Sequence, residues 1–180
     1  NLGANAILGV SMAVCKAGAA CSDKRIYEYV QKISNSRKSL LPVPQMNVIN
    51  SGKHIGIDND IQEHMIMPTR FKSFSDALRA GVETYHTLKN ILKQKYGAKA
   101  ILLGDEGGFA PQIEKVEQRL ELMLKAIKEA GYSDKIKLAL DCAASEFFDD
   151  KNGKYNILNK KYTHGELIDF YKNLIKKYSV

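Results

Sequence analysis

The 180-residue sequence predicts an α/β fold of the barrel type. Two strand patterns follow one another directly, at residues 45–50 and 62–67, and Pro68 ends the second. After this pair, amphipathic helical patterns alternate with short apolar runs. Alternating strands and helices are typical of α/β folds, in which the strands form one central sheet or barrel. We therefore expect a barrel that begins with a pair of strands.

The first part of the chain has a different composition. Residues 1–21 are rich in alanine, glycine and other small residues, which let a helix pack closely against its neighbours, so we expect a buried helix here. Residues 26–33 predict a second, shorter helix. The polar segment 34–39 is the best candidate for a linker, and Pro42 and Pro44 after it favour an extended backbone.

The later helices are marked by caps and by apolar faces. Ser73 and Asp76 are spaced as in a capping box, which satisfies backbone N–H groups at a helix start, and Thr163 and Glu166 form the standard version of that motif. Apolar residues at helical spacing define three faces: Leu78, Val82, Tyr85, Leu88 and Leu92, then Val116, Leu120, Met123 and Ile127, and finally Leu167, Tyr171, Leu174 and Tyr178.

Three short segments complete the expected pattern. The apolar runs at residues 101–103 and 136–141 are expected to be strands. Residues 150–153 predict a hairpin turn between Phe148 and Tyr155.

Composition limits the class of protein. Hydrophobic residues make up 44% and charged residues 26%, which fits a soluble globular protein rather than a disordered chain. No apolar run approaches the roughly 20 residues of a membrane span, so we predict none. The net charge of +7 permits contact with polyanions. Because no Arg-rich arm, zinc-finger spacing or RNA-platform motif is present, we predict no nucleic-acid partner and keep nucleic-acid binding only as an alternative.

The cysteine pattern indicates a reducing compartment. Cys15, Cys21 and Cys142 are odd in number and form no Cys-x-x-Cys motif. We therefore expect buried free thiols in a reducing compartment.

Acidic residues recur at the ends of the expected strands. Glu63 lies in the second strand, Asp105 and Glu106 follow the run at 101–103, and Asp141 ends the strand at 136–141. In an α/β barrel the C-terminal ends of the strands converge, and carboxylates that meet there repel one another unless they share a proton or a cation. Mg²⁺ prefers such oxygen ligands. The alternative is that these acids are helix caps or surface ion pairs, which we would favour for any one of them alone.

Two further segments are candidates for a site. Glycines flank the acids of Gly104-Asp-Glu-Gly-Gly108, so the backbone can form a tight turn that confines them, although an ordinary glycine turn has the same pattern. His54 lies on a polar loop, residues 51–60, and a histidine on a flexible loop can close over an anionic substrate. A surface histidine is the alternative. His64, His86 and His164 receive no predicted role.

Six motifs together resemble the enolase family, phosphopyruvate hydratase. They occur in the family's order, and the resemblance runs from residue 1 to the end of the chain. The motifs are Asn5-Ala-Ile-Leu-Gly-Val-Ser11, Leu41-Pro-Val-Pro44, Asn47-Val-Ile-Asn50, Gln62-Glu63, Gly104-Asp-Glu-Gly-Gly-Phe-Ala-Pro111 and Asp141-Cys-Ala-Ala-Ser-Glu-Phe147. The sequence of segment 141–148 resembles that of eukaryotic members of the family.

The resemblance implies a fold and an activity. Residues 1–40 are similar to the end of the α+β N-terminal domain of enolase. Residues 41–180 are similar to the first part of its modified TIM barrel, which begins with two antiparallel strands. The implied activity is the Mg²⁺-dependent dehydration of 2-phosphoglycerate to phosphoenolpyruvate in glycolysis. A cytoplasmic homodimer that takes a small phosphorylated substrate is implied as well.

The resemblance also implies residue roles. The glutamate that matches Glu106 is the catalytic proton donor. Residues that match Gln62 and Glu63 lie beside the substrate, and the histidine that matches His54 sits on a mobile loop that closes on it. The aspartate that matches Asp141 is one of three carboxylates that bind Mg²⁺.

The sequence departs from the family pattern at a few positions. Ser51 stands where glycine is usual, His64 stands where an aromatic residue is usual, and residues 55–60 are unusually acidic. Both ends look cut, and the other two carboxylates and the catalytic lysine would lie beyond residue 180. We therefore expect this chain alone neither to close a barrel nor to turn over substrate. A catalytically dead enolase-like binding protein is the alternative, which the downstream residues would distinguish.

Overall fold

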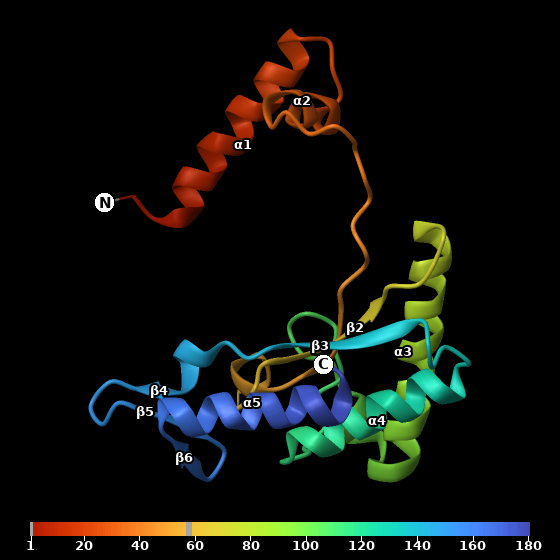
Figure 1. Ribbon diagram of the computed structural model, residues 1–180, viewed down its shortest axis with the longest axis vertical. Coiled ribbons are helices and arrows are strands. Elements are labelled where there is room, and N and C mark those ends of the chain that lie inside the picture. Colours follow the sequence, from red (N-terminus) through yellow and green to blue (C-terminus); the bar gives the residue numbers. More distant parts are fainter. Residues whose placement is uncertain (1, 57–58) are drawn as a thin grey trace. The chain divides into compact units, whose positions relative to one another are not determined.

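The computed structural model describes residues 2–56 and 59–180. Contacts divide the chain into two compact units, Asn1–Pro42 and Val43–Val180. The division falls just after the linker expected at residues 34–39. Figure 1 labels helices and strands of both units.

The first unit consists of two helices, α1 (Ala4–Cys21) and α2 (Ile26–Ile33). They pack closely where Tyr29 lies over Gly18, since a Cβ atom at Gly18 would come within 2.4 Å of the Tyr29 hydroxyl. The expectation that the first helix is buried is wrong for this unit, because Ala19 is the one buried residue of α1. Apolar side chains lie around the whole helix and α2 covers one part of it, so Ile7 and Val10 are 59% and 66% exposed.

Two other expectations concern a membrane span and the state of the cysteines. The 18 residues of α1 are long and apolar enough to cross a membrane, a criterion that core helices of soluble proteins meet too. The absence of a membrane span therefore stays an expectation. All three cysteines are free, as predicted, but Cys21 is exposed and Cys15 and Cys142 are only partly buried.

The second unit is built on a three-stranded antiparallel sheet. The strands β1 (Met46–Asn50), β2 (Glu63–Pro68) and β3 (Ile136–Asp141) lie in the order β1-β2-β3. The register pairs Asn50 with Glu63 and Glu63 with Asp141, and a bulge interrupts β1 between Asn47 and Ile49. The expected antiparallel pair at the start of the barrel part is confirmed.

Three helices pack with this sheet into an α/β unit, as predicted (Figure 1). They are α3 (Phe74–Tyr96), α4 (Val116–Glu129) and α5 (His164–Tyr178). Both expected caps are present: the Ser73 hydroxyl accepts a hydrogen bond from the Asp76 amide at 3.1 Å, and the Glu166 carboxylate accepts one from the Thr163 amide at 2.7 Å. The shared core contains Val48, Ile49, Ile66, Leu88, Leu92, Leu120, Met123, Ile127, Ile136, Leu138 and Leu174.

The predicted strand at residues 101–103 is wrong. Residues Ala98–Ile101 form the 3₁₀ helix η2 instead. Leu103 makes a single antiparallel bridge to Phe109, and Phe109 makes a parallel bridge to Ile49 of β1. A narrow hairpin therefore lies beside β1 where a strand was expected, because the glycines after Leu103 reverse the chain at once.

A small second sheet follows the main one. The short strand β4 (Phe148–Asp149) pairs with β5 (Lys154–Ile157), and β5 pairs with β6 (Lys160–Tyr162). Phe148 lies opposite Tyr155, which confirms the predicted hairpin turn. The 3₁₀ helix η3 (Ala144–Phe147) leads into this sheet, and Phe147, Ile157 and Leu167 form a separate core under it.

Candidate functional site

Three polar residues lie side by side at the edge of the main sheet that is formed by the ends of its strands, not by an outer strand. Asn50 ends β1, Glu63 begins β2 and Asp141 ends β3, and the strand register pairs each with the next. The sequence pattern led us to expect Glu63 at the C-terminal end of its strand. It lies at the N-terminal end instead. Because β2 runs opposite to both neighbours, its beginning meets their ends. Glu63 is half-buried, and Asp141 is exposed.

Glu106 lies at the tip of the hairpin beside this edge. The Gly104 amide donates to the Gly108 carbonyl at 2.9 Å, and the Gly107 amide donates to the Gly104 carbonyl at 3.1 Å. Gly107 has φ +81°, a conformation that other residues rarely adopt. The predicted tight glycine turn is confirmed, although it does not follow a strand.

A side chain of β1 holds the glutamate. The Asn47 amide donates a hydrogen bond of 3.0 Å to Oε2 of Glu106, which is exposed. The hydroxyl of Tyr85, on α3, donates to the Gly107 carbonyl at 2.8 Å, and its ring stacks on Phe109 at 4.3 Å. Burial raises the pKa of Tyr85. A strand and a helix therefore fix the turn on two sides.

Asn50 ends one of the six motifs, but the sequence analysis gave it no role in the site. Its backbone N–H donates to the Phe109 carbonyl at 2.8 Å, and its fully buried side chain fills the space beside two glycines. A Cβ atom at Gly104 would lie 2.7 Å from the Asn50 Cβ, and one at Gly108 would lie 2.1 Å from its Oδ1. These two glycines are needed for close approach. The side-chain polar atoms of Asn50 have no hydrogen-bond partner among the described residues.

Asp141 has the chemistry of a Mg²⁺ ligand. Its Oδ1 accepts a hydrogen bond from the Ala143 amide at 3.0 Å, which turns the chain sharply after β3, with Ala143 at φ 45°. An exposed carboxylate suits Mg²⁺, which takes one or two protein carboxylates together with water and phosphate. Among the described residues, however, no group of three or more His, Cys, Asp or Glu side chains is placed to hold a metal. Further ligands would have to come from elsewhere.

The segment between β1 and β2 contains the remaining candidates. His54 lies in the 3₁₀ helix η1 (Gly52–Ile55), and its side chain is outside the described part of the structure, as are residues 57 and 58. Gln62 is half-buried directly before Glu63. The Ser51 amide donates to the Gln62 carbonyl at 2.8 Å, so the two ends of the segment are joined at its base.

Comparison with known proteins decides the family. Residues 38–180 match the family described as "Enolase, C-terminal TIM barrel domain". The chain belongs to the enolase family.

Relatives named Enolase match the whole chain. The protein from Thermococcus gammatolerans is 50% identical over 182 residues, and that from Methanopyrus kandleri is 51% identical over 182 residues. Each alignment covers 100% of this chain and 42% of the relative. The protein from Methanocaldococcus jannaschii is 49% identical over 179 residues, which is 99% of this chain and 41% of that relative. The chain thus spans about two fifths of their length.

The comparisons also bear on the expected barrel fold and on the expected resemblance to eukaryotic members of the family. The TIM-barrel match agrees with the α/β unit observed after Pro42. These three relatives are archaeal, so the eukaryotic style of residues 141–148 stays an expectation.

A buried polar network lies behind the sheet edge of this enolase-family chain. The carboxylate of Asp60 pairs with the guanidinium of Arg119, and their side chains are 0% and 2% exposed. The Ser51 hydroxyl donates to Asp60 Oδ2, and His64 Nε2 lies 3.5 Å from Arg119 Nη1. Burial holds the pKa of His64 well below its usual value, and the charge of Arg119 lowers it further.

This network revises one interpretation of the sequence. The sequence placed Asp60 in a polar loop, residues 51–60, but its side chain is buried in an ion pair with Arg119. Sequence reasoning also missed Arg119. A signal was present, because Arg119 follows Val116 by three positions and precedes Met123 by four, which places a charge on the buried face of α4.

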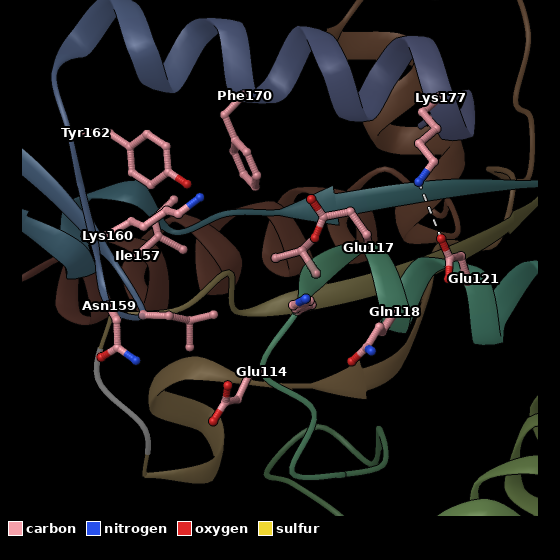
Figure 2. Close-up of a pocket in the computed structure, with 13 residues that line it drawn as sticks. Glu114, Glu117, Gln118, Glu121, Ile157, Asn159, Lys160, Tyr162, Phe170 and Lys177 are labelled. Carbon is pink, nitrogen blue, oxygen red and sulfur yellow. Dashed lines mark hydrogen bonds and ion pairs between the residues drawn. The ribbon is translucent and has the colours of Figure 1, made fainter.

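Figure 2 shows a cavity in the second unit. It has a volume of about 620 Å³ and lies between the start of α4, the hairpin β5–β6 and α5. Glu117, Tyr162 and Phe170 line it, and Lys177 pairs with Glu121 across 3.4 Å at its rim. None of the predicted site residues with described side chains lines this cavity, so it is separate from the candidate site.

Proposed function

We propose that the full-length protein containing this chain is an enolase that dehydrates 2-phosphoglycerate to phosphoenolpyruvate with Mg²⁺. Membership of the enolase family supports this proposal. The observation that supports it best is the edge where Glu63 and Asp141 lie opposite each other, beside the hairpin that bears Glu106. Two carboxylates at one edge, with a third on the neighbouring hairpin, suit a reaction that moves protons and stabilises negative charge.

Glu106 is proposed as the general acid. Hydroxide is a poor leaving group, so the departing oxygen needs a proton. As the general acid, Glu106 would have to hold a proton and give it to that oxygen. The hydrogen bond from Asn47 and the turn at Gly107 would hold the Glu106 side chain in one orientation. Gln62 and Glu63 would lie beside the substrate, and His54 would approach it from the preceding segment.

Asp141 is proposed as one ligand of the metal. Bound Mg²⁺ would supply electrostatic stabilisation of the negative charge that develops on the substrate. Asp141 is an exposed oxygen donor whose orientation is fixed by the Ala143 amide, as such a ligand requires. Two further carboxylates and the catalytic lysine are proposed to lie outside residues 1–180.

The proposal also covers the domains of the protein, its oligomeric state and its location in the cell. Residues 1–40 would be the end of the enolase N-terminal domain, and residues 41–180 would begin its barrel. We propose a cytoplasmic glycolytic enzyme that forms a homodimer, has no membrane span and does not bind nucleic acid. The apolar side chains that α1 exposes would be covered by other parts of the N-terminal domain.

The test is an assay of the full-length protein. Purified protein is treated with a chelator, and phosphoenolpyruvate formation is followed by absorbance before and after Mg²⁺ is restored. Turnover that stops with the chelator and returns with Mg²⁺ is expected. Binding of 2-phosphoglycerate and Mg²⁺ without turnover would favour the catalytically dead binding protein instead.

A further inference from the structure

We propose that Arg119 is a positioning residue of the candidate site: through its ion pair with Asp60 it fixes the start of β2, and with it Gln62 and Glu63. The inference rests on the proposed function, in which Gln62 and Glu63 lie beside the substrate. Arg119 does not belong to the predicted site residues. It acts from α4, behind the sheet edge.

Asp60 is held from three directions. Its Oδ2 accepts hydrogen bonds from Arg119 Nη2 and from the Ser51 hydroxyl, and its Oδ1 accepts one from the Ile61 amide at 2.8 Å. All of these groups are buried. The carboxylate therefore joins Ser51, directly after β1, to Ile61, which leads into β2. The three hydrogen bonds together fix the orientation of the Asp60 side chain.

Arg119 is itself fixed on the other side. Its Nε donates to the Ile113 carbonyl at 2.8 Å, and Nη2 donates to the same oxygen at 2.5 Å. The backbone before α4 thus sets the plane of the guanidinium, which is pre-organised to meet a carboxylate. His64, in β2, lies against the same guanidinium, so Arg119 connects the backbone before α4 to both Asp60 and β2.

The stability of this ion pair alone does not account for its presence. A buried ion pair is often no more stabilising than apolar side chains of similar size, because both charges lose their water. What the pair supplies is a fixed position. The Ser51 amide donates to the Gln62 carbonyl, and Asn50 pairs with Glu63. The end of β1 therefore holds residues 62 and 63, and the ion pair holds residue 60 just before them. Loss of the pair would free residues 60–62 from the side of α4.

The experiment separates positioning from stability in the full-length protein. The variants are Asp60→Asn, Arg119→Met, and the double variant Asp60→Leu with Arg119→Met. The single variants leave a buried group unpaired, so we expect lower melting temperatures and a raised KM for 2-phosphoglycerate. The double variant leaves no unpaired buried charge, so its melting temperature should lie above those of both single variants. Its KM should remain raised by roughly tenfold, since misplacement by about 1 Å can cost as much as 100-fold.

A matched control removes an exposed ion pair from the same helix. Lys125 and Glu129 pair at 3.6 Å on the surface of α4, so Lys125→Met with Glu129→Leu should leave KM unchanged. A double Asp60–Arg119 variant with wild-type KM would overturn the proposal. Single variants that melt earlier but keep the wild-type KM would do the same, because the pair would then be purely structural.

A measurement without substrate tests the positioning independently of the proposed activity. In the double variant, amide hydrogen exchange at Ser51, whose acceptor is the Gln62 carbonyl, should be roughly tenfold faster while α4 stays protected, since exchange reports local opening. Unchanged exchange at Ser51 would contradict the proposal whether or not the protein is an enolase. A wild-type protein without turnover would instead contradict the proposed function and leave this exchange test in force.

Discussion

Glu63 lies directly opposite Asp141 across the antiparallel strands β2 and β3. One residue begins its strand and the other ends its strand, so the two acids meet only because β2 is reversed. A parallel β2 would place Glu63 at the opposite edge of the sheet, away from Asp141 and from the hairpin of Glu106. The leading antiparallel pair is therefore the feature of the fold that brings the candidate acids together.

Glu106→Gln in the full-length protein should nearly abolish dehydration while Mg²⁺ binding is retained. The amide keeps the shape of the side chain but has no proton of suitable acidity to give to the leaving group. General acid catalysis contributes roughly 10²–10⁴-fold, so kcat should fall within this range. The rate is measured by phosphoenolpyruvate absorbance and Mg²⁺ binding by calorimetry.

The control for this variant is Glu129→Gln, an exposed glutamate on α4 far along the chain from the turn. It should leave kcat unchanged. If Glu106→Gln lost less than about tenfold in kcat, Glu106 would not be the general acid.

Asp141→Ala should weaken Mg²⁺ binding and, through it, activity. Loss of one carboxylate removes a ligand from the metal, so excess Mg²⁺ should partly restore the rate. Calorimetry measures the affinity directly. Asp169→Ala, which removes an exposed surface aspartate that is paired with Lys172, is the matched control and should change neither quantity. Unchanged Mg²⁺ affinity in Asp141→Ala would show that Asp141 is not a ligand.

Gly108→Ala should lower the free energy of unfolding by about 1–3 kcal/mol, the usual cost of overpacking a core. The added methyl group would lie 2.1 Å from Oδ1 of Asn50, which is buried and has little room to move. Urea denaturation measures the change. Gly165→Ala is the control, because it lies in helix α5 with no heavy atom within 4 Å of the added Cβ. It should be neutral or slightly stabilising, and equal losses at both positions would argue against the packing at Asn50.

Local patterns predicted the elements that depend on local chemistry. The caps at Ser73 and Thr163 and the turn between Phe148 and Tyr155 follow from side chains a few residues apart, and all three are present. The strand expected at residues 101–103 failed, and two of its three apolar side chains stay outside the core: Leu102 and Leu103 are 63% and 61% exposed, whereas Ile101 packs against the core. An apolar run by itself does not reveal which way it faces.

The candidate site was predictable only in part, for the same reason. Motifs identified Glu63, Glu106 and Asp141, but not the contacts that orient them. Asn47 bonds to Glu106 across 59 positions of sequence, and the ion pair of Asp60 with Arg119 spans the same separation. Neither separation follows a helical or strand period, so the partners appear only when the chain is folded.

Residues 1–180 expressed alone should be inactive and should aggregate. The chain spans about two fifths of its relatives, and the three-stranded sheet leaves the outer edge of β3 without a strand among the described residues. Exposed apolar side chains on α1, such as Ile7 and Val10, add a second surface for association. Light scattering measures size, and phosphoenolpyruvate absorbance measures turnover. A cooperatively folding monomer with the turnover of the full-length protein would contradict this expectation.

The full-length protein should lose stability as the pH falls below about 6.5, and His64 should account for part of that loss. Burial and Arg119 depress the pKa of His64 in the folded protein, whereas the unfolded chain takes up a proton near the ordinary value of 6.5. The unfolded state then binds more protons, so the free energy of unfolding falls by up to about 1.4 kcal/mol per pH unit from pH 6.5 toward the folded pKa. His64→Phe should flatten this slope between about pH 6.5 and 5, above the range in which carboxylates titrate. Urea denaturation across this range measures the slope, and His164→Gln, at an exposed histidine, should leave it as in the wild type. The same slope in His64→Phe as in the wild type would mean that His64 does not stay neutral in the folded protein.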